Sequence, residues 1–153
     1  PQPLSAPPKS GMSGCMIAII VAAVLAVPMM GILAAIALPA YNDYTLRAKV
    51  AMALPVAEPA KTALISHLSS EQTCPSNEDA GFGAPESYAS GTVASISFGQ
   101  FESELCGMEL ILAVPGKAAL DGKAVWLEYD PSDSSWQCSS EIDDKYLPIQ
   151  CRG

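Results

Sequence analysis

The sequence contains few basic side chains, and they are scattered along the chain without forming a cluster. Eight Lys and Arg stand against sixteen Asp and Glu in 153 residues, which gives a net charge of −8. Because nucleic acids and other polyphosphates are bound through basic surfaces, this balance argues against them as ligands. We therefore expect no nucleic-acid partner. The length of 153 residues leaves room for one domain and a membrane anchor.

Histidine, a common catalytic and metal-binding residue, is also scarce. His67 is the single histidine, it falls in a helical pattern, and no serine or cysteine motif places a nucleophile beside it. Glu78 with Asp79 and Asp143 with Asp144 form acidic pairs, which are more often solvated loop charges than cation sites. We therefore expect no enzymatic activity, no cofactor and no metal site.

Charge is absent altogether from one long stretch. Residues 11–40 contain no Asp, Glu, Lys or Arg, and the apolar run exceeds the ~20 residues that a membrane-spanning helix needs. A transmembrane helix over residues 15–40 is predicted. The alternatives are a buried soluble helix, which needs a domain able to enclose it, and a cleaved secretory signal, whose apolar region is only ~7–15 residues long.

The segment that precedes this run differs in composition. Residues 1–14 are rich in Pro, Ser and Gly and are predicted to be a linker. The sequence begins without Met, which fits a processed product or a fragment of a longer chain. Cys15 lies at the start of the apolar run and is expected to be a free thiol in the membrane.

Two prolines lie inside the apolar run. Pro28 and Pro39 each remove a backbone hydrogen bond, and Gly31 lies between them, so the helix is expected to loosen over residues 31–39. In hydrocarbon, broken backbone pairs are tolerated only where neighbouring protein satisfies them. Partner helices are therefore expected.

An amphipathic pattern follows the apolar run. Tyr41 and Tyr44 are placed at the membrane exit, and a helix over residues 41–68 is predicted from apolar residues at helical spacing. Pro55 and Pro59 should kink or break it. The apolar members of the pattern are Leu46, Val50, Ala53, Leu54, Ala57, Leu64 and Leu68.

The remainder of the predicted head, residues 41–153, is a loop followed by a sheet. Residues 69–92 are rich in Ser, Gly, Pro and acidic side chains, which is typical of a long irregular connection. Over residues 93–140, apolar and polar residues alternate between turn signals, which predicts an antiparallel sheet of three or four strands. The fold class is α+β, with the helix packed on the sheet. The alternating apolar positions are Ile96, Phe98, Met108, Leu110, Leu112, Val114, Val125, Leu127 and Tyr129.

Four cysteines follow the apolar run, at Cys74, Cys106, Cys138 and Cys151. An even set in the water-facing part indicates an oxidising compartment, and it allows three pairings. A zinc site is the other use of four thiols, but the absence of a C-x-x-C pair argues against it. The aromatic residues Tyr88, Trp126 and Trp136 are interpreted as packing residues, with ligand binding as the alternative.

Both ends of the chain resemble the type IV pilin family. Residues 31–41 read GILAAIALPAY and are followed by NDY and TLRAKV, a run similar to the conserved N-terminal helix of these proteins. Residues 57–63 (AEPAKTA) continue the similarity. Residues 136–140 (WQCSS) and 145–152 (KYLPIQCR) resemble the terminal loop of the family.

This resemblance implies a pilin fold with a variable, exposed αβ loop and a terminal loop over residues 138–151. The family pattern pairs Cys138 with Cys151, which leaves Cys74 for Cys106. It also implies that residues 31–39 unwind in assembled filaments. The implied function is a structural subunit of a type IV pilus or pilus-like filament, assembled through its apolar helix and supporting adhesion or motility.

One departure from the family pattern favours an alternative function. Family members begin with a methylated phenylalanine and carry a glutamate four residues further on, whereas the equivalent positions here are Ala18 and Ala22, and no acidic residue precedes Asp43. The alternative is a non-polymerising single-pass membrane protein whose exported head is a binding module. Expected partners are membrane lipid, copies of itself or other pilins, and the pilus assembly machinery. The expected locations are the bacterial inner membrane, with an exported head, and the extracellular filament.

Overall fold

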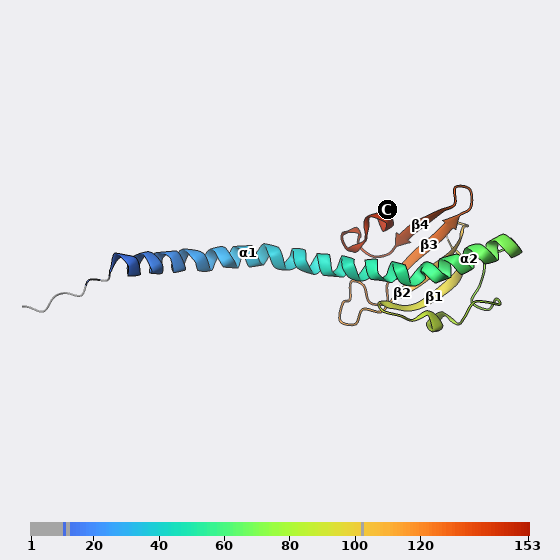
Figure 1. Cartoon of the computed structure of the whole chain (residues 1–153), viewed down its shortest axis with the longest axis horizontal. Coiled ribbons are helices and arrows are strands. Elements are labelled where there is room, and N and C mark those ends of the chain that lie inside the picture. Colours follow the sequence, from blue (N-terminus) through green and yellow to red (C-terminus); the bar gives the residue numbers. More distant parts are fainter. Residues whose placement is uncertain (1–10, 12, 102) are drawn as a thin grey trace, which may run out of the picture. The chain divides into compact units, whose positions relative to one another are not determined.

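A computed structural model describes residue 11, residues 13–101 and residues 103–153, which form two compact units that divide after Tyr41. Figure 1 shows the elements coloured along the sequence. In chain order they are helix α1 (Gly14–Ala53), 3-10 turn η1 (Leu54–Ala57), helix α2 (Glu58–Glu71), 3-10 turn η2 (Pro85–Tyr88), strands β1 (Val93–Gln100), β2 (Cys106–Leu112), β3 (Ala124–Asp130) and β4 (Ser135–Ser140), and 3-10 turns η3 (Asp144–Tyr146) and η4 (Ile149–Cys151).

Helix α1 begins one residue earlier than predicted. The carbonyl of Ser13 accepts hydrogen bonds from the N–H groups of Met16 and Ile17, at 2.8 and 3.2 Å, so Ser13 is the residue that caps the helix. The predicted linker therefore gives way to helix at Gly14. Residues 1–10 and 12 of that linker lie outside the described residues.

The single amphipathic helix predicted over residues 41–68 is two segments. Helix α1 runs through the boundary between the units to Ala53, and α2 follows after η1. Pro55 lies in the first turn of η1 and Pro59 in the first turn of α2, where a missing N–H costs no hydrogen bond. The expected break lies at η1, between the two helices.

Helix α2 ends at Glu71, three residues beyond the predicted end. Ser69 and Ser70 lie in the helix, and their hydroxyls donate to the carbonyls of Ile65 (2.7 Å) and His67 (3.1 Å). Gln72 then adopts a left-handed conformation with φ 55° and ends it. The connection to the sheet accordingly starts at residue 72 and not at 69.

The sheet has four antiparallel strands in the order β1-β2-β3-β4, which confirms the α+β fold class. Phe98 pairs with Met108, and Met108 pairs with Leu127, so these apolar side chains share one face. Strand β4 is mostly polar, so its sequence shows little alternation. It pairs with β3 and places Cys138 opposite Leu127. Within the second unit, the helical segments cross one face of the sheet (Figure 1).

The inner face of the sheet and the apolar stripe of the helices in the second unit form one core. Its fully buried members come from every layer of this unit. Packing of this kind couples the elements, because a cavity in any one of them weakens all of its neighbours. The core includes Leu46, Val50, Ala53, Ala57, Ala60, Leu64, Ile96, Met108, Leu110, Leu112, Leu120, Val125, Leu127 and Leu147.

Asn77 holds the connection between α2 and β1 in place. Its side-chain amide donates to the carbonyls of Gly83 (2.8 Å) and Ile96 (3.0 Å), and its side-chain oxygen accepts from the N–H of Phe98 (2.8 Å). Strand β1 is at the edge of the sheet, so Asn77 satisfies backbone groups that no further strand pairs. The loop is thus fixed to the sheet by one side chain.

Replacing Asn77 by Ala should lower the free energy of unfolding by about 1–3 kcal/mol, because three backbone groups lose their partner. Denaturant unfolding of the full chain in detergent measures this change. Asn42→Ala removes an exposed amide and is the control. If both variants lowered the free energy of unfolding by the same amount, Asn77 would not anchor the loop.

Candidate functional site

The first unit presents an uninterrupted apolar surface. In the described residues, no side chain of α1 before Leu46 is buried. The helix is long and apolar enough to cross a membrane, with an 18-residue window of mean hydropathy 2.7. Large exposed apolar patches mark sites of interaction with lipid or protein. The large exposed side chains are Met16, Ile17, Ile19, Ile20, Val21, Val24, Leu25, Val27, Met29, Met30, Ile32, Leu33, Ile36 and Leu38.

Pro28, Gly31 and Pro39 all lie within α1, which remains helical across them. Each proline lacks the N–H group that would normally bond the carbonyl four residues earlier, which belongs to Val24 for Pro28 and to Ala35 for Pro39. A Cβ at Gly31 would meet nothing within 4 Å. The glycine is therefore not required by packing within the chain, and the loosening of residues 31–39 stays a prediction about the assembled state.

The two tyrosines near the unit boundary are largely exposed. Tyr41 and Tyr44 retain 68% and 66% of their accessible surface. Amphipathic aromatic side chains of this kind favour the interface between hydrocarbon and water. Their position at the membrane exit remains a prediction that fits this exposure.

Helix α1 changes character in the second unit, where it becomes part of the core. Leu46, Val50 and Ala53 are buried at the helical spacing that places them on one face. On the neighbouring turn, the guanidinium of Arg47 donates to the carbonyl of Lys145 through Nε (3.2 Å) and Nη2 (2.6 Å). One side chain of α1 thus binds the C-terminal loop, a contact that spacing along the sequence did not reveal.

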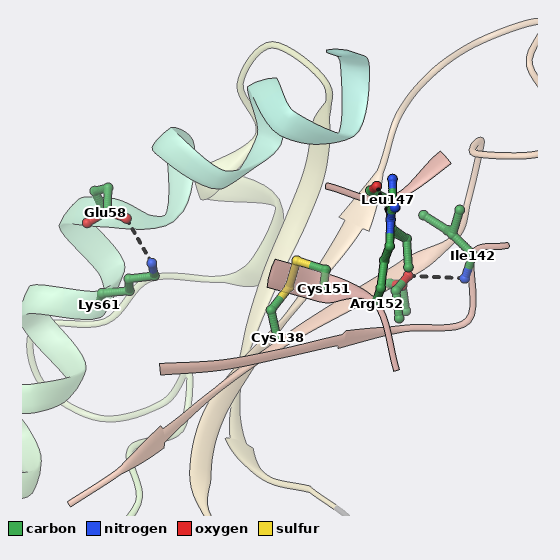
Figure 2. Close-up of a disulfide and its surroundings, with 9 residues drawn as sticks. Glu58, Lys61, Cys138, Ile142, Leu147, Cys151 and Arg152 are labelled. Carbon is green, nitrogen blue, oxygen red and sulfur yellow. Dashed lines mark hydrogen bonds and ion pairs between the residues drawn. A yellow bond between two sulfur atoms is a disulfide. The ribbon is translucent and has the colours of Figure 1, made fainter. Parts of the chain in front are cut away.

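Two disulfides close the head. Cys138 is bonded to Cys151, which joins β4 to η4, with 4.5 Å between the Cα atoms (Figure 2). Cys74 is bonded to Cys106, which joins the loop after α2 to the start of β2, with 5.1 Å between the Cα atoms. These are the pairs that the family resemblance implies. Cys15 is exposed and free.

Hydrogen bonds reinforce the disulfide-closed terminal loop. Arg152 Nε donates to the carbonyl of Leu147 at 3.0 Å, and the carboxylate of Asp143 accepts from the backbone N–H of Lys145 at 3.2 Å. A hydrogen bond to the side chain of Tyr146 and the nearby charge of Asp143 raise the pKa of the Lys145 ammonium. Both effects favour the charged form of Lys145.

Lys61 connects α2 to β4 through an aromatic ring. Its ammonium group lies 2.8 Å from Glu58 Oε1 and 5.3 Å from the ring centroid of Trp136 (Figure 2 shows the ion pair). Trp136 in turn packs on Tyr129, with 5.3 Å between centroids. The packing interpretation of Trp136 agrees with these contacts. The spacing of Glu58 and Lys61 along the helix could have indicated the ion pair. It could not have indicated that the ammonium group of Lys61 lies over the ring of Trp136.

The other polar candidates serve local structure. His67 packs edge-on against Phe82 at 5.5 Å between centroids. Hydrogen bonds from the backbone N–H and hydroxyl of Ser76 lower the pKa of Asp79. Across the described part of the chain, no cluster of three His, Cys, Asp or Glu side chains could hold a metal ion.

Comparison with known proteins matches residues 46–152 to a family model described as pilin, bacterial filament. Fimbrial protein EcpC of Eikenella corrodens is 35% identical over 134 residues, which cover 84% of each chain. Type IV major pilin protein PilE1 of Neisseria gonorrhoeae is 30% identical, over 84% of this chain and 69% of the relative. A Cs1 pilin chimera shares the fold with a TM-score of 0.50 at 20% identity, over 71% of this chain and 98% of its own.

Peptide mapping without reduction should recover Cys138 linked to Cys151 and Cys74 linked to Cys106, with Cys15 open to alkylation. Replacing Cys138 and Cys151 together by Ser should lower the free energy of unfolding by about 3 kcal/mol, since the bond closes a short loop. Cys15→Ser is the matched control and should leave stability unchanged. A crossed pairing, or a free thiol at Cys138, would contradict the assignment.

Proposed function

Because this chain belongs to the type IV pilin family, we propose that the apolar part of α1, residues 14–40, is the segment through which it assembles. The protein is a structural pilus subunit, and members of its family assemble into filaments with other pilins. The observation that carries the proposal is the complete exposure of an uncharged helix. In the filament, this segment would bundle with the same segment of neighbouring subunits while the head faces outward.

The composition of the segment supports close helix packing. Association between helices in an apolar environment depends on small residues that let backbones approach and on satisfied polar groups. The free carbonyls that Pro28 and Pro39 create would find donors only in a neighbouring protein or in water. Small residues occur along the whole segment, at Gly14, Ala18, Ala22, Ala23, Ala26, Gly31, Ala34, Ala35, Ala37 and Ala40.

Before assembly, the same segment would need another apolar environment. A bilayer supplies it, because the helix is long enough to cross the hydrocarbon layer. The subunit would therefore wait in the bacterial inner membrane with its disulfide-closed head exported, and the pilus assembly machinery would transfer it to the filament. Adhesion or motility is the use that we propose for the filament.

A second candidate function rests on the first turns of the helix. Ala18 and Ala22 are exposed, and α1 has no acidic residue in its first turn. Without a carboxylate in this region, the subunit has no negative charge with which to bind the amino terminus of a neighbour. The alternative is a subunit that stays in the membrane and uses its head as a binding module.

Replacing Leu33 by Asp should remove the chain from filaments. An aspartate at the centre of an apolar helix costs about 3 kcal/mol, roughly a hundredfold in the equilibrium. Filaments sheared from cells and probed by immunoblot report the result, and the membrane fraction shows whether the variant accumulates. Leu33→Met keeps volume and apolarity and should assemble normally.

Ile149→Asp places the same charge on an exposed head residue and tests whether the effect is specific to the helix. Recovery of Leu33→Asp in filaments at the wild-type level would refute assembly through this segment. Recovery of the unmodified chain only in membranes would favour the second candidate.

A further inference from the structure

The outer face of the sheet, opposite the core, carries a hollow that assembly through α1 does not use. Its volume is about 820 Å³, within the usual range for small-molecule sites. All of its walls belong to the second unit. The described residues that line it are Phe101, Ser103, Trp126, Glu128, Ser139 and Ser140.

Strand register places two glycines beside Glu128. Gly99 pairs with Gly107, and Gly107 pairs with Glu128, so two neighbouring strands present no side chain beside this carboxylate. A Cβ at Gly107 would come within 2.6 Å of the Leu127 carbonyl and 2.9 Å of Glu128 Cγ. Only glycine fits at that position, because the side chain of Glu128 lies against it.

The indole of Trp126 is held in place at one side of the hollow. Its Nε1–H donates to Glu109 Oε2 at 3.1 Å, across the β2 and β3 strands. The residue opposite it on β4 is Ser139, which is too small to cover the ring. An aromatic ring that is fixed and partly uncovered offers its face to a ligand at little cost in conformational entropy.

Two carboxylates lie on this face without a cation. Glu128 is only 9% exposed, and Ser103 donates its hydroxyl to one oxygen of it. Glu109 is its diagonal neighbour across the strands. In the described part of the chain, the ion pairs join Lys61 to Glu58, Lys123 to Glu141 and Lys145 to Asp143.

None of the six described side chains that line the hollow is basic, and one of them is the carboxylate of Glu128. A cation in the hollow would gain a charge-assisted contact with this carboxylate. A cation is therefore the complementary ligand, and the adjacent indole face favours one with an apolar surface.

We propose that this hollow binds a small organic ammonium ion, with the alkylated nitrogen over the indole of Trp126 and its charge against Glu128. Attraction between a cation and the face of Trp is strongest for poorly hydrated ammonium groups. The hydroxyls of Ser103 and Ser139 would border the ligand. This site is independent of filament assembly, which uses the other unit.

The test uses the full chain, labelled with ¹⁵N-tryptophan, in nonionic detergent micelles. The chain has two tryptophans, so two indole N–H signals are expected, and Trp126→Phe identifies the one that bonds Glu109. Tetramethylammonium chloride should shift the Trp126 signal in a saturable way. Neither sodium chloride at the same ionic strength nor tert-butanol, a neutral molecule of similar size, should do so.

Glu128→Gln keeps the acceptor for Ser103 and removes the charge, and it should weaken tetramethylammonium binding at least about fivefold. Glu78→Gln removes an exposed charge from the αβ loop and should leave binding unchanged. Saturation transfer from protein to the ligand methyl groups provides a second readout, and Trp126→Leu should abolish it.

Three results would overturn the proposal. The first is an unmoved Trp126 signal, and the second is equal affinity in Glu128→Gln and the unmodified chain. The third is a shift caused by a neutral monosaccharide such as galactose but not by tetramethylammonium, which would assign the hollow to sugars.

Discussion

An apolar helix that its own chain leaves exposed is the constraint on which the rest of the structure depends. Water orders unfavourably around so much apolar surface, so the segment before Asn42 requires lipid or other helices. The same helix continues into the second unit, where the side chains of Leu46 and Val50 are buried in the core. One continuous element therefore serves two environments, and the change between them falls where charged residues begin.

This division of the helix limits how much apolar surface the head can bury. Only the last turns of α1 and the helix α2 are available to cover the sheet, so the head needs stabilising interactions besides its core. The two disulfides supply these at the αβ loop and at the C-terminal loop. Arg47 adds a direct link from α1 to the terminal loop, and Lys61 adds another from α2 to Trp136.

The sequence predicted the features that depend on local pattern. The absence of charge marked α1, and alternation marked β1, β2 and β3, because burial on one side imposes a period. The features it did not reveal depend on contacts between distant segments. Asn77 meets β1 only after the loop folds, and β4 is too polar to show alternation. The hollow beside Trp126 is lined by residues of β3, β4 and the connection between β1 and β2, which are distant in the sequence. The end of α2 lies beyond the predicted one because the polar residues Ser69 and Ser70 are helical, which composition could not decide.

Cryo-electron microscopy of filaments purified from cells that express this chain tests the central claim most directly. The account predicts density for residues 14–40 at the filament axis, packed against the same segment of neighbouring subunits, with the disulfide-closed heads outside. Density that places this segment in contact with solvent would contradict it, as would filaments that form normally while the chain remains in the membrane.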